Sequence, residues 1–192
     1  MTMARRGLDI ETIIATAANI ADHEGIEAVT MAALSEKLGV RSPSLYNHIN
    51  GLDGIRRLLA LRGLKELGNT LSRAAAANAD IKTEEPMLEL AKAYILFARK
   101  HPGLYELTLH APDEEEGEYA DAGNRIIELL MNVLKPYELE QDEIIHSIRG
   151  FRSMLHGFSA LERKGGFGMP LEVEESLSFA IKAFLNGLQR QR

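Results

Sequence analysis

The side chains best suited to contacting another molecule are gathered in one stretch, which runs from Thr30 to Ile49 and reads TMAALSEKLGVRSPSLYNHI. Two short helical patterns flank Gly39-Val40-Arg41, a compact turn of the kind that sets two helices at a steep angle. In the second pattern, a step of about 100° per residue places Leu45 and Ile49 on one face. The opposite face carries small or hydrogen-bonding side chains, with no acid among them: Ser44, Asn47 and His48. A helix that enters the major groove of DNA requires such a face, so the stretch is a candidate helix-turn-helix for contacts with double-stranded DNA.

Local signals place the ends of these two helices. Thr30 is expected to cap the first helix, and Gly39 is expected to end it, because glycine adopts the positive φ that the turn requires. Ser42 is a suitable cap for the second helix, with Pro43 at its first helical position and its end near residues 50–51. The alternative interpretation is a structural turn between two core helices.

The composition is that of a globular protein, since 45% of the 192 residues are hydrophobic and 26% are charged. The absence of cysteine excludes disulfides and thiolate metal sites. No run approaches the roughly 18–20 apolar residues that a membrane helix needs, and Asp9, Glu11 and Asp22 interrupt any apolar core of a signal peptide. We therefore expect a cytoplasmic protein with no membrane partner.

The charge is unevenly distributed along the chain. Residues 1–63 hold seven basic and seven acidic side chains, so the remaining residues, with 15 basic and 21 acidic, carry the whole net charge of −6. This asymmetry indicates two functional parts. A neutral N-terminal part can still approach phosphates if its basic groups share one face.

The rest of the chain also has helical periodicity, with no convincing alternation typical of a strand. Besides the two helices above, we expect helices over about 9–24, 52–77, 84–101 (with Thr83 as its cap), 103–110, 118–135, 140–164 and from 171 to the C-terminus. The predicted fold class is all-α. Three N-terminal helices form a helix-turn-helix domain over residues 1–51, and a larger helical domain covers residues 52–192, joined through the helix that begins at residue 52.

Enzyme and metal motifs are missing from the sequence. It contains no G-x-S-x-G, P-loop or dinucleotide fingerprint, and no two of the six histidines have the i, i+4 spacing of a helical zinc site. We therefore predict no enzymatic activity, no metal site and no cofactor.

The segment Ser42-Pro43-Ser44-Leu45-Tyr46-Asn47-His48-Ile49, with Gly25 ending the first helix and Thr30 starting the second, resembles the TetR family of bacterial regulators. The resemblance covers about residues 8–60. It implies phosphate contacts for Tyr46 and His48, and base or phosphate contacts for Arg41, Ser42, Ser44 and Asn47. Thr30 would start its helix and touch the DNA backbone. One position departs from the family pattern, because Leu52 stands where a lysine is usual; Arg56 and Arg57 could replace part of that contact, or could simply be solvated.

For the C-terminal part, the resemblance implies a helical bundle with a cavity for an unknown small-molecule effector, and a homodimer interface formed by the last two long helices, over 140–164 and after Pro170. Both helices have broad apolar faces, which burial within one chain would also explain. Candidate pocket residues are Tyr94, Phe97, Tyr105, His110, Met131, Phe151, Arg152, Met154 and His156. For each of them the alternative interpretation, which the residues alone favour, is ordinary core.

Met154-Leu155-His156-Gly157-Phe158, followed by Leu161-Glu162 and Gly166-Phe167, resembles one C-terminal subtype of the same family. The resemblance as a whole implies a transcriptional repressor that a ligand releases from a palindromic operator. The alternative is a helical dimeric adaptor or sensor that does not bind an operator, which the leucine at position 52 and the neutral N-terminal part would favour.

Overall fold

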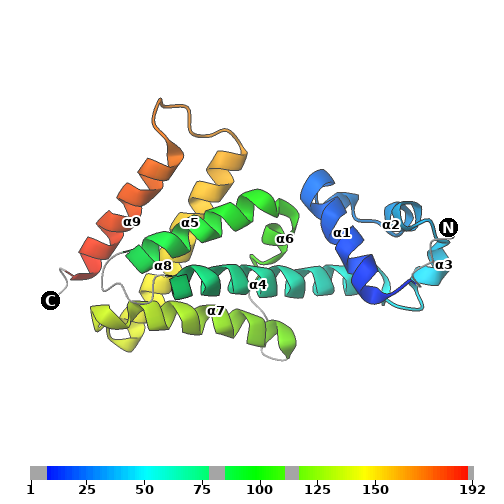
Figure 1. Cartoon of the computed structure of the whole chain (residues 1–192), viewed down its shortest axis with the longest axis horizontal. Coiled ribbons are helices and arrows are strands. Elements are labelled where there is room, and N and C mark those ends of the chain that lie inside the picture. Colours follow the sequence, from blue (N-terminus) through cyan, green and yellow to red (C-terminus); the bar gives the residue numbers. More distant parts are fainter. Residues whose placement is uncertain (1–7, 78–84, 111–116, 190–192) are drawn as a thin grey trace. The chain divides into compact units, whose positions relative to one another are not determined.

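The computed structural model describes residues 8–77, 85–110 and 117–189, and these residues form helices, turns and loops without a strand (Figure 1). The predicted all-α fold class is confirmed. The chain divides into two compact units: one takes the residues up to Leu64 together with a later segment that begins at His101, and the other takes the rest. No helix in the described part of the chain has the length and apolar character needed to cross a membrane.

The first unit begins with α1 (Ile10–Glu24), whose N-cap is Asp9. The Asp9 carboxylate accepts a hydrogen bond from the Thr12 N–H at 2.7 Å, and six apolar side chains of α1 are buried. A short 3₁₀ turn, η1 (Ile26–Ala28), leads to α2 (Met31–Leu38) and α3 (Ser42–Leu45). The helix α4 (Gly51–Ala77) then starts within this unit and continues into the second.

The helix α6 (Pro102–Leu107) belongs to the first unit because glycines let it approach two other helices closely. A Cβ atom on Gly103 would lie 2.3 Å from the backbone of Ala21 in α1, and one on Gly63 of α4 would lie 2.9 Å from the Leu104 carbonyl oxygen. The sequence predicts this helix over 103–110, whereas the structure ends it at Leu107.

The Asp22 carboxylate of α1 fixes the start of α6. It accepts hydrogen bonds from the Gly103 N–H at 2.9 Å and the Leu104 N–H at 3.0 Å. Its other oxygen lies 2.9 Å from Nδ1 of His101. Because the first N–H groups of a helix have no partner within the helix, a half-buried carboxylate at this place stabilises the junction between α1 and α6.

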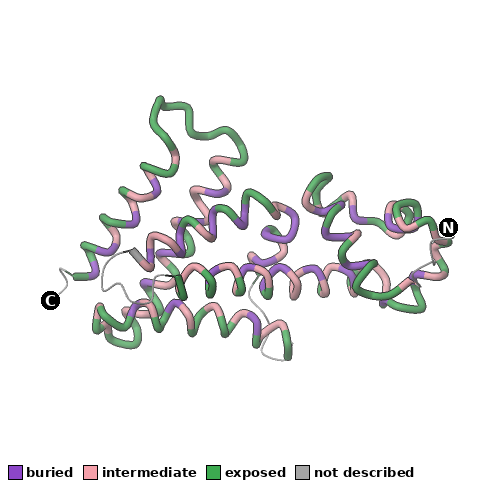
Figure 2. Tube along the Cα trace, in the orientation of Figure 1, coloured by how far each residue is buried: buried purple, intermediate pink, exposed green. Residues whose placement is uncertain are grey.

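The second unit consists of the later part of α4, α5 (Glu85–Lys100), α7 (Glu118–Leu134), the 3₁₀ turn η2 (Lys135–Tyr137), α8 (Gln141–Arg163) and α9 (Val173–Gln189). α5 packs against α8 and α9, and α7 packs against α8. Each helix buries one side and exposes the other, as Figure 2 shows. The predicted cap Thr83 lies outside the described residues.

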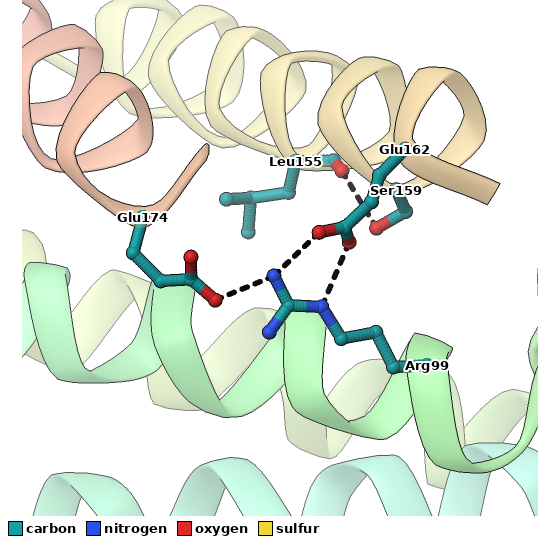
Figure 3. A network of polar contacts seen from close by, with 5 residues as sticks. All are labelled: Arg99, Leu155, Ser159, Glu162 and Glu174. Atoms are coloured by element: carbon teal, nitrogen blue, oxygen red, sulfur yellow. Dashed lines mark hydrogen bonds and ion pairs between the residues drawn. The ribbon is translucent and has the colours of Figure 1, made fainter. Parts of the chain in front are cut away.

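Arg99 joins three helices of the second unit (Figure 3). Its Nε and Nη2 atoms donate to the two carboxylate oxygens of Glu162 on α8 at 2.7 and 2.6 Å, and Nη2 also lies 2.6 Å from Glu174 on α9. The hydrogen bond to Glu162, followed by the one to Glu174, raises the pKa of Arg99 further above its usual range. The hydrogen bond from Arg99 lowers the pKa of Glu174. Such a bidentate arginine–carboxylate contact fixes the orientation of the two side chains and also pairs their charges.

Candidate nucleic-acid interface

The helix α2 begins and ends where the sequence predicts. The Thr30 hydroxyl accepts a hydrogen bond from the Ala33 N–H at 3.1 Å, which confirms Thr30 as the cap. Gly39 has φ 64° and ψ 32°, the left-handed conformation expected of a residue that ends a helix. The N–H of Val40 then bonds the carbonyl oxygen of Ser35 at 3.0 Å, so the chain reverses immediately after α2.

The second helix of the predicted helix-turn-helix is expected to end near residues 50–51, and this prediction is wrong. α3 comprises only Ser42–Leu45, with Arg41 as its N-cap, so Ser42 lies one position inside the helix rather than at its cap. The N–H groups of His48 and Ile49 both bond the Leu45 carbonyl, at 2.9 and 3.2 Å. The residues after Leu45 therefore form tight turns in place of a further helical turn.

Two buried side chains hold this segment against the first unit. Leu45 is 0% exposed and Ile49 is 5% exposed, which agrees with their predicted place on the same face of the helix. Between them, the predicted contact residues point outward: Tyr46 is 59% exposed, and Asn47 and His48 are also exposed. Thr30 and Arg41 are exposed, and Ser42 and Ser44 are half-exposed. A polar, acid-free surface of this kind can reach base edges and phosphates.

The cations near this surface differ in their availability. Lys37 is paired with Glu24 at 2.6 Å, and Arg56 with Glu27 at 3.3 Å. Arg41 and Arg57 are exposed and have no ion-pair partner among the described residues. Leu52, at the usual lysine position, is half-exposed. Of the two arginines that could take over its role, Arg57 is therefore the one not already paired.

Ser35 is a residue of this site that the sequence analysis misses. Its side chain is 8% exposed, and its hydroxyl contacts both the Met31 carbonyl at 2.7 Å and the Ser42 hydroxyl at 2.8 Å. The two serines lie seven positions apart in the sequence, and only the tertiary arrangement of α2 and α3 brings them together. A serine among alanines and leucines at a buried position of α2 is the one signal that the sequence offers.

The candidate pocket residues do not form one group. Tyr94, Phe97 and Phe151 are buried within the second unit, at 7%, 3% and 2% exposure. Other candidates of that unit lie nearer its surface, with Met154 and His156 half-exposed and Arg152 and Met131 exposed. The two remaining candidates belong to the first unit, with Tyr105 buried and His110 exposed.

Two family models match the chain. Residues 13–48 match the model of bacterial regulatory proteins of the tetR family, and residues 87–184 match the tetracyclin repressor-like C-terminal domain. The first match contains α2, the turn, α3 and the three residues after it, up to His48.

Individual relatives agree with these matches. The chain is 44% identical over 186 residues to the uncharacterized HTH-type transcriptional regulator YobS of Bacillus subtilis (strain 168), which covers 96% of this chain and 94% of that protein. The fold is similar to a protein of unknown function from Rhodococcus sp. RHA1, with a TM-score of 0.79, 19% identity, and coverage of 99% of this chain and 100% of that one. It is also similar to a TetR variant from Acinetobacter baumannii AYE in complex with minocycline, with a TM-score of 0.69, 18% identity, and coverage of 96% and 98%.

The chain therefore belongs to the tetR family and is a DNA-binding transcriptional regulator.

Proposed function

We propose that this protein is a repressor that binds a palindromic operator as a homodimer and is released by a small molecule. The observation that carries the operator assignment is the surface formed by Arg41, Tyr46, Asn47 and His48, which is exposed and free of acids while Leu45 behind it is fully buried. Exposed hydrogen-bonding groups of this type suit contacts with base edges and phosphates.

The homodimer is supported by apolar side chains left uncovered on α8 and α9. Phe179 of α9 is 77% exposed, and Leu161 of α8 is 51% exposed. A Cβ atom added to Gly157 in the middle of α8, or to Gly187 in α9, would meet nothing within 4 Å, so another helix could approach closely at both positions. A second copy packed on this surface gives the two-fold symmetry that a palindromic operator requires.

The effector site is proposed to lie within the second unit. Tyr94 and Phe97 of α5 and Phe151 of α8 supply the aromatic interior, and Met154 and His156 are half-exposed residues of α8. An apolar lining with a few polar groups is the usual composition of a small-molecule site. The bound minocycline of the Acinetobacter relative is a precedent in the fold for an organic ligand, without identifying the ligand of this chain.

The small molecule would release the protein from its operator if effector binding in the second unit lowered the affinity of the first unit for DNA. α4 is one continuous helix with residues in both units, so it offers a covalent route between them. The two reading segments of a dimer must stand about 34–36 Å apart to enter successive major grooves. A coupling free energy of about 1–3 kcal/mol would change operator affinity by roughly 5–150-fold.

The test is selection of bound sequences from a random duplex pool with the purified full chain at two salt concentrations. The proposal predicts a two-fold palindrome whose affinity falls with salt, because binding to phosphates releases counterions. A pool without sequence preference at either salt concentration would overturn the operator assignment.

A further inference from the structure

The hydrogen bonds of Ser35 determine which way the Ser42 hydroxyl can act. The Ser35 hydroxyl lies 2.7 Å from the Met31 carbonyl oxygen and 2.8 Å from the Ser42 hydroxyl oxygen. A carbonyl oxygen can only accept, and a serine hydroxyl has a single hydrogen to donate. Ser35 therefore donates its hydrogen to the Met31 carbonyl oxygen. In the contact between the two serines, Ser42 must be the donor and Ser35 the acceptor.

Ser42 is left with lone pairs alone for any other molecule. It is half-exposed at the first position of α3 and next to the exposed Arg41, on the surface assigned to DNA. Phosphate oxygens are acceptors too, so this hydroxyl has no hydrogen to give them. In the major groove, the donors that face an acceptor are the exocyclic amino groups, N6 of adenine and N4 of cytosine.

We propose that Ser35 fixes Ser42 as a hydrogen-bond acceptor, and that Ser42 thereby selects an adenine or a cytosine at one position of each half-site through the exocyclic amino group. Ser42 is thus a specificity-determining residue, and Ser35 positions it without touching DNA. This inference rests on the proposed operator binding and narrows it, because the family resemblance alone allows Ser42 to contact either a base or a phosphate.

Ser44 provides a matched control within the same helix. It is also a half-exposed serine, two residues further on, and its hydroxyl has no hydrogen-bond partner among the described residues. Its hydrogen remains available, so removal of Ser35 should leave the contacts of Ser44 unchanged.

The experiment compares parallel selections with the wild type and with Ser35→Ala, Ser42→Ala and Ser44→Ala, after circular dichroism has verified their folding. The wild type should enrich adenine or cytosine at one position per half-site. Ser42→Ala should lose that enrichment. Ser35→Ala should broaden it to guanine and thymine, because the released Ser42 hydrogen can now be donated to their O6, N7 or O4 acceptors. Ser44→Ala should retain the enrichment.

A second arm uses the wild-type protein and therefore does not depend on the folding of any variant. In the recovered operator, the selected adenine is replaced by purine, or the selected cytosine by pyrimidin-2-one. Each replacement removes only the exocyclic amino group. The replacement that weakens binding shows whether Ser42 contacts adenine or cytosine. Loss of one hydrogen bond predicts a decrease in affinity of roughly 2–10-fold for the wild type. The same change should leave the affinity of Ser42→Ala unaltered.

The outcomes separate this inference from the proposed function. A wild-type pool without any preference would overturn both. Two results would overturn the role of the serine pair and leave operator binding intact. One is a clear operator for which Ser42→Ala has the same base preference as the wild type. The other is a Ser35→Ala variant that keeps the wild-type base preference and only binds the operator more weakly. Equal affinity of the wild type for operators with and without the amino group would also overturn it.

Discussion

Gly103 of α6 lies against the backbone of Ala21 in α1 so closely that a Cβ atom would stand 2.3 Å from its carbonyl carbon and oxygen. Because backbone atoms cannot move aside as the end of a long side chain can, only glycine fits at this position. The contact holds α6 in the same compact unit as the segment from Thr30 to Ile49, although Gly103 lies 54 positions after Ile49 in the sequence.

Gly103→Ala should destabilise the protein by about 1–3 kcal/mol, the usual cost of overpacking. In a chain of this size, each kcal/mol corresponds to a decrease in Tm of roughly 2–4 °C, measurable by thermal unfolding. Gly168→Ala is the control, because a Cβ atom there meets nothing within 4 Å and the residue has no positive φ. Equal Tm values for the two variants would contradict the close contact.

Asp22→Ala should also destabilise the junction of α1 with α6. The substitution leaves the N–H groups of Gly103 and Leu104 without their carboxylate partner, at a cost of about 1–3 kcal/mol in urea unfolding. Asp53→Ala removes an exposed acid with no partner in the described part of the chain, so its effect should stay below about 0.5 kcal/mol. The idea fails if Asp22→Ala is as stable as Asp53→Ala.

Stability should decrease in acid partly through Glu174. Its hydrogen bond from Arg99 lowers its pKa below the ordinary value of 4.5, so the carboxylate stabilises the folded state above that pH and loses this contribution as the pH falls through the lowered pKa. Glu174→Gln should therefore cost about 0.2–1 kcal/mol at pH 7, since the pair is partly exposed, and less at about pH 3.5.

Urea unfolding at both pH values measures this difference. Glu175→Gln is the control, because Glu175 is an exposed neighbour on α9 whose side chain has no partner among the described residues. A cost for Glu174→Gln that is the same at both pH values would show that the ion pair with Arg99 does not produce it.

Phe179→Glu should convert the proposed homodimer into monomers, because it places a charge on the exposed apolar surface of α8 and α9. Sedimentation velocity of the wild type and the variant at equal concentration measures the change. Met131→Glu introduces the same charge at an exposed apolar position of α7, and it should remain dimeric. A wild type that sediments as a monomer, or a Phe179→Glu variant that stays dimeric, would contradict the interface.

Local signals in the sequence were sufficient to predict much of the structure of the segment from Thr30 to Ile49. The Thr30 cap, the turn at Gly39 and the buried pair Leu45 and Ile49 all follow from rules that act within a few residues, and the structure confirms them. The length of α3 was missed, because helical periodicity does not show whether tight turns replace the last turn of a short helix.

Contacts between distant residues were beyond sequence reasoning. Arg56 looked available for phosphate, yet it pairs with Glu27, and Arg99 meets Glu162 from a helix 63 residues away. The contact between Ser35 and Ser42 likewise depends on how α2 and α3 cross. Such pairings are set by packing, for which a single sequence offers no period or motif.

The central claim, that the exposed segment around α3 reads the operator, is tested most directly by fluorescence anisotropy with the selected duplex. The combined variant Tyr46→Phe with His48→Ala removes two exposed hydrogen-bonding groups while keeping the buried Leu45 anchor. The control is Tyr137→Phe with His146→Ala, the same changes in the second unit. We predict that the first variant binds the operator about 10–100-fold more weakly and that the control binds like the wild type. Wild-type affinity in a folded Tyr46→Phe, His48→Ala protein would contradict the account.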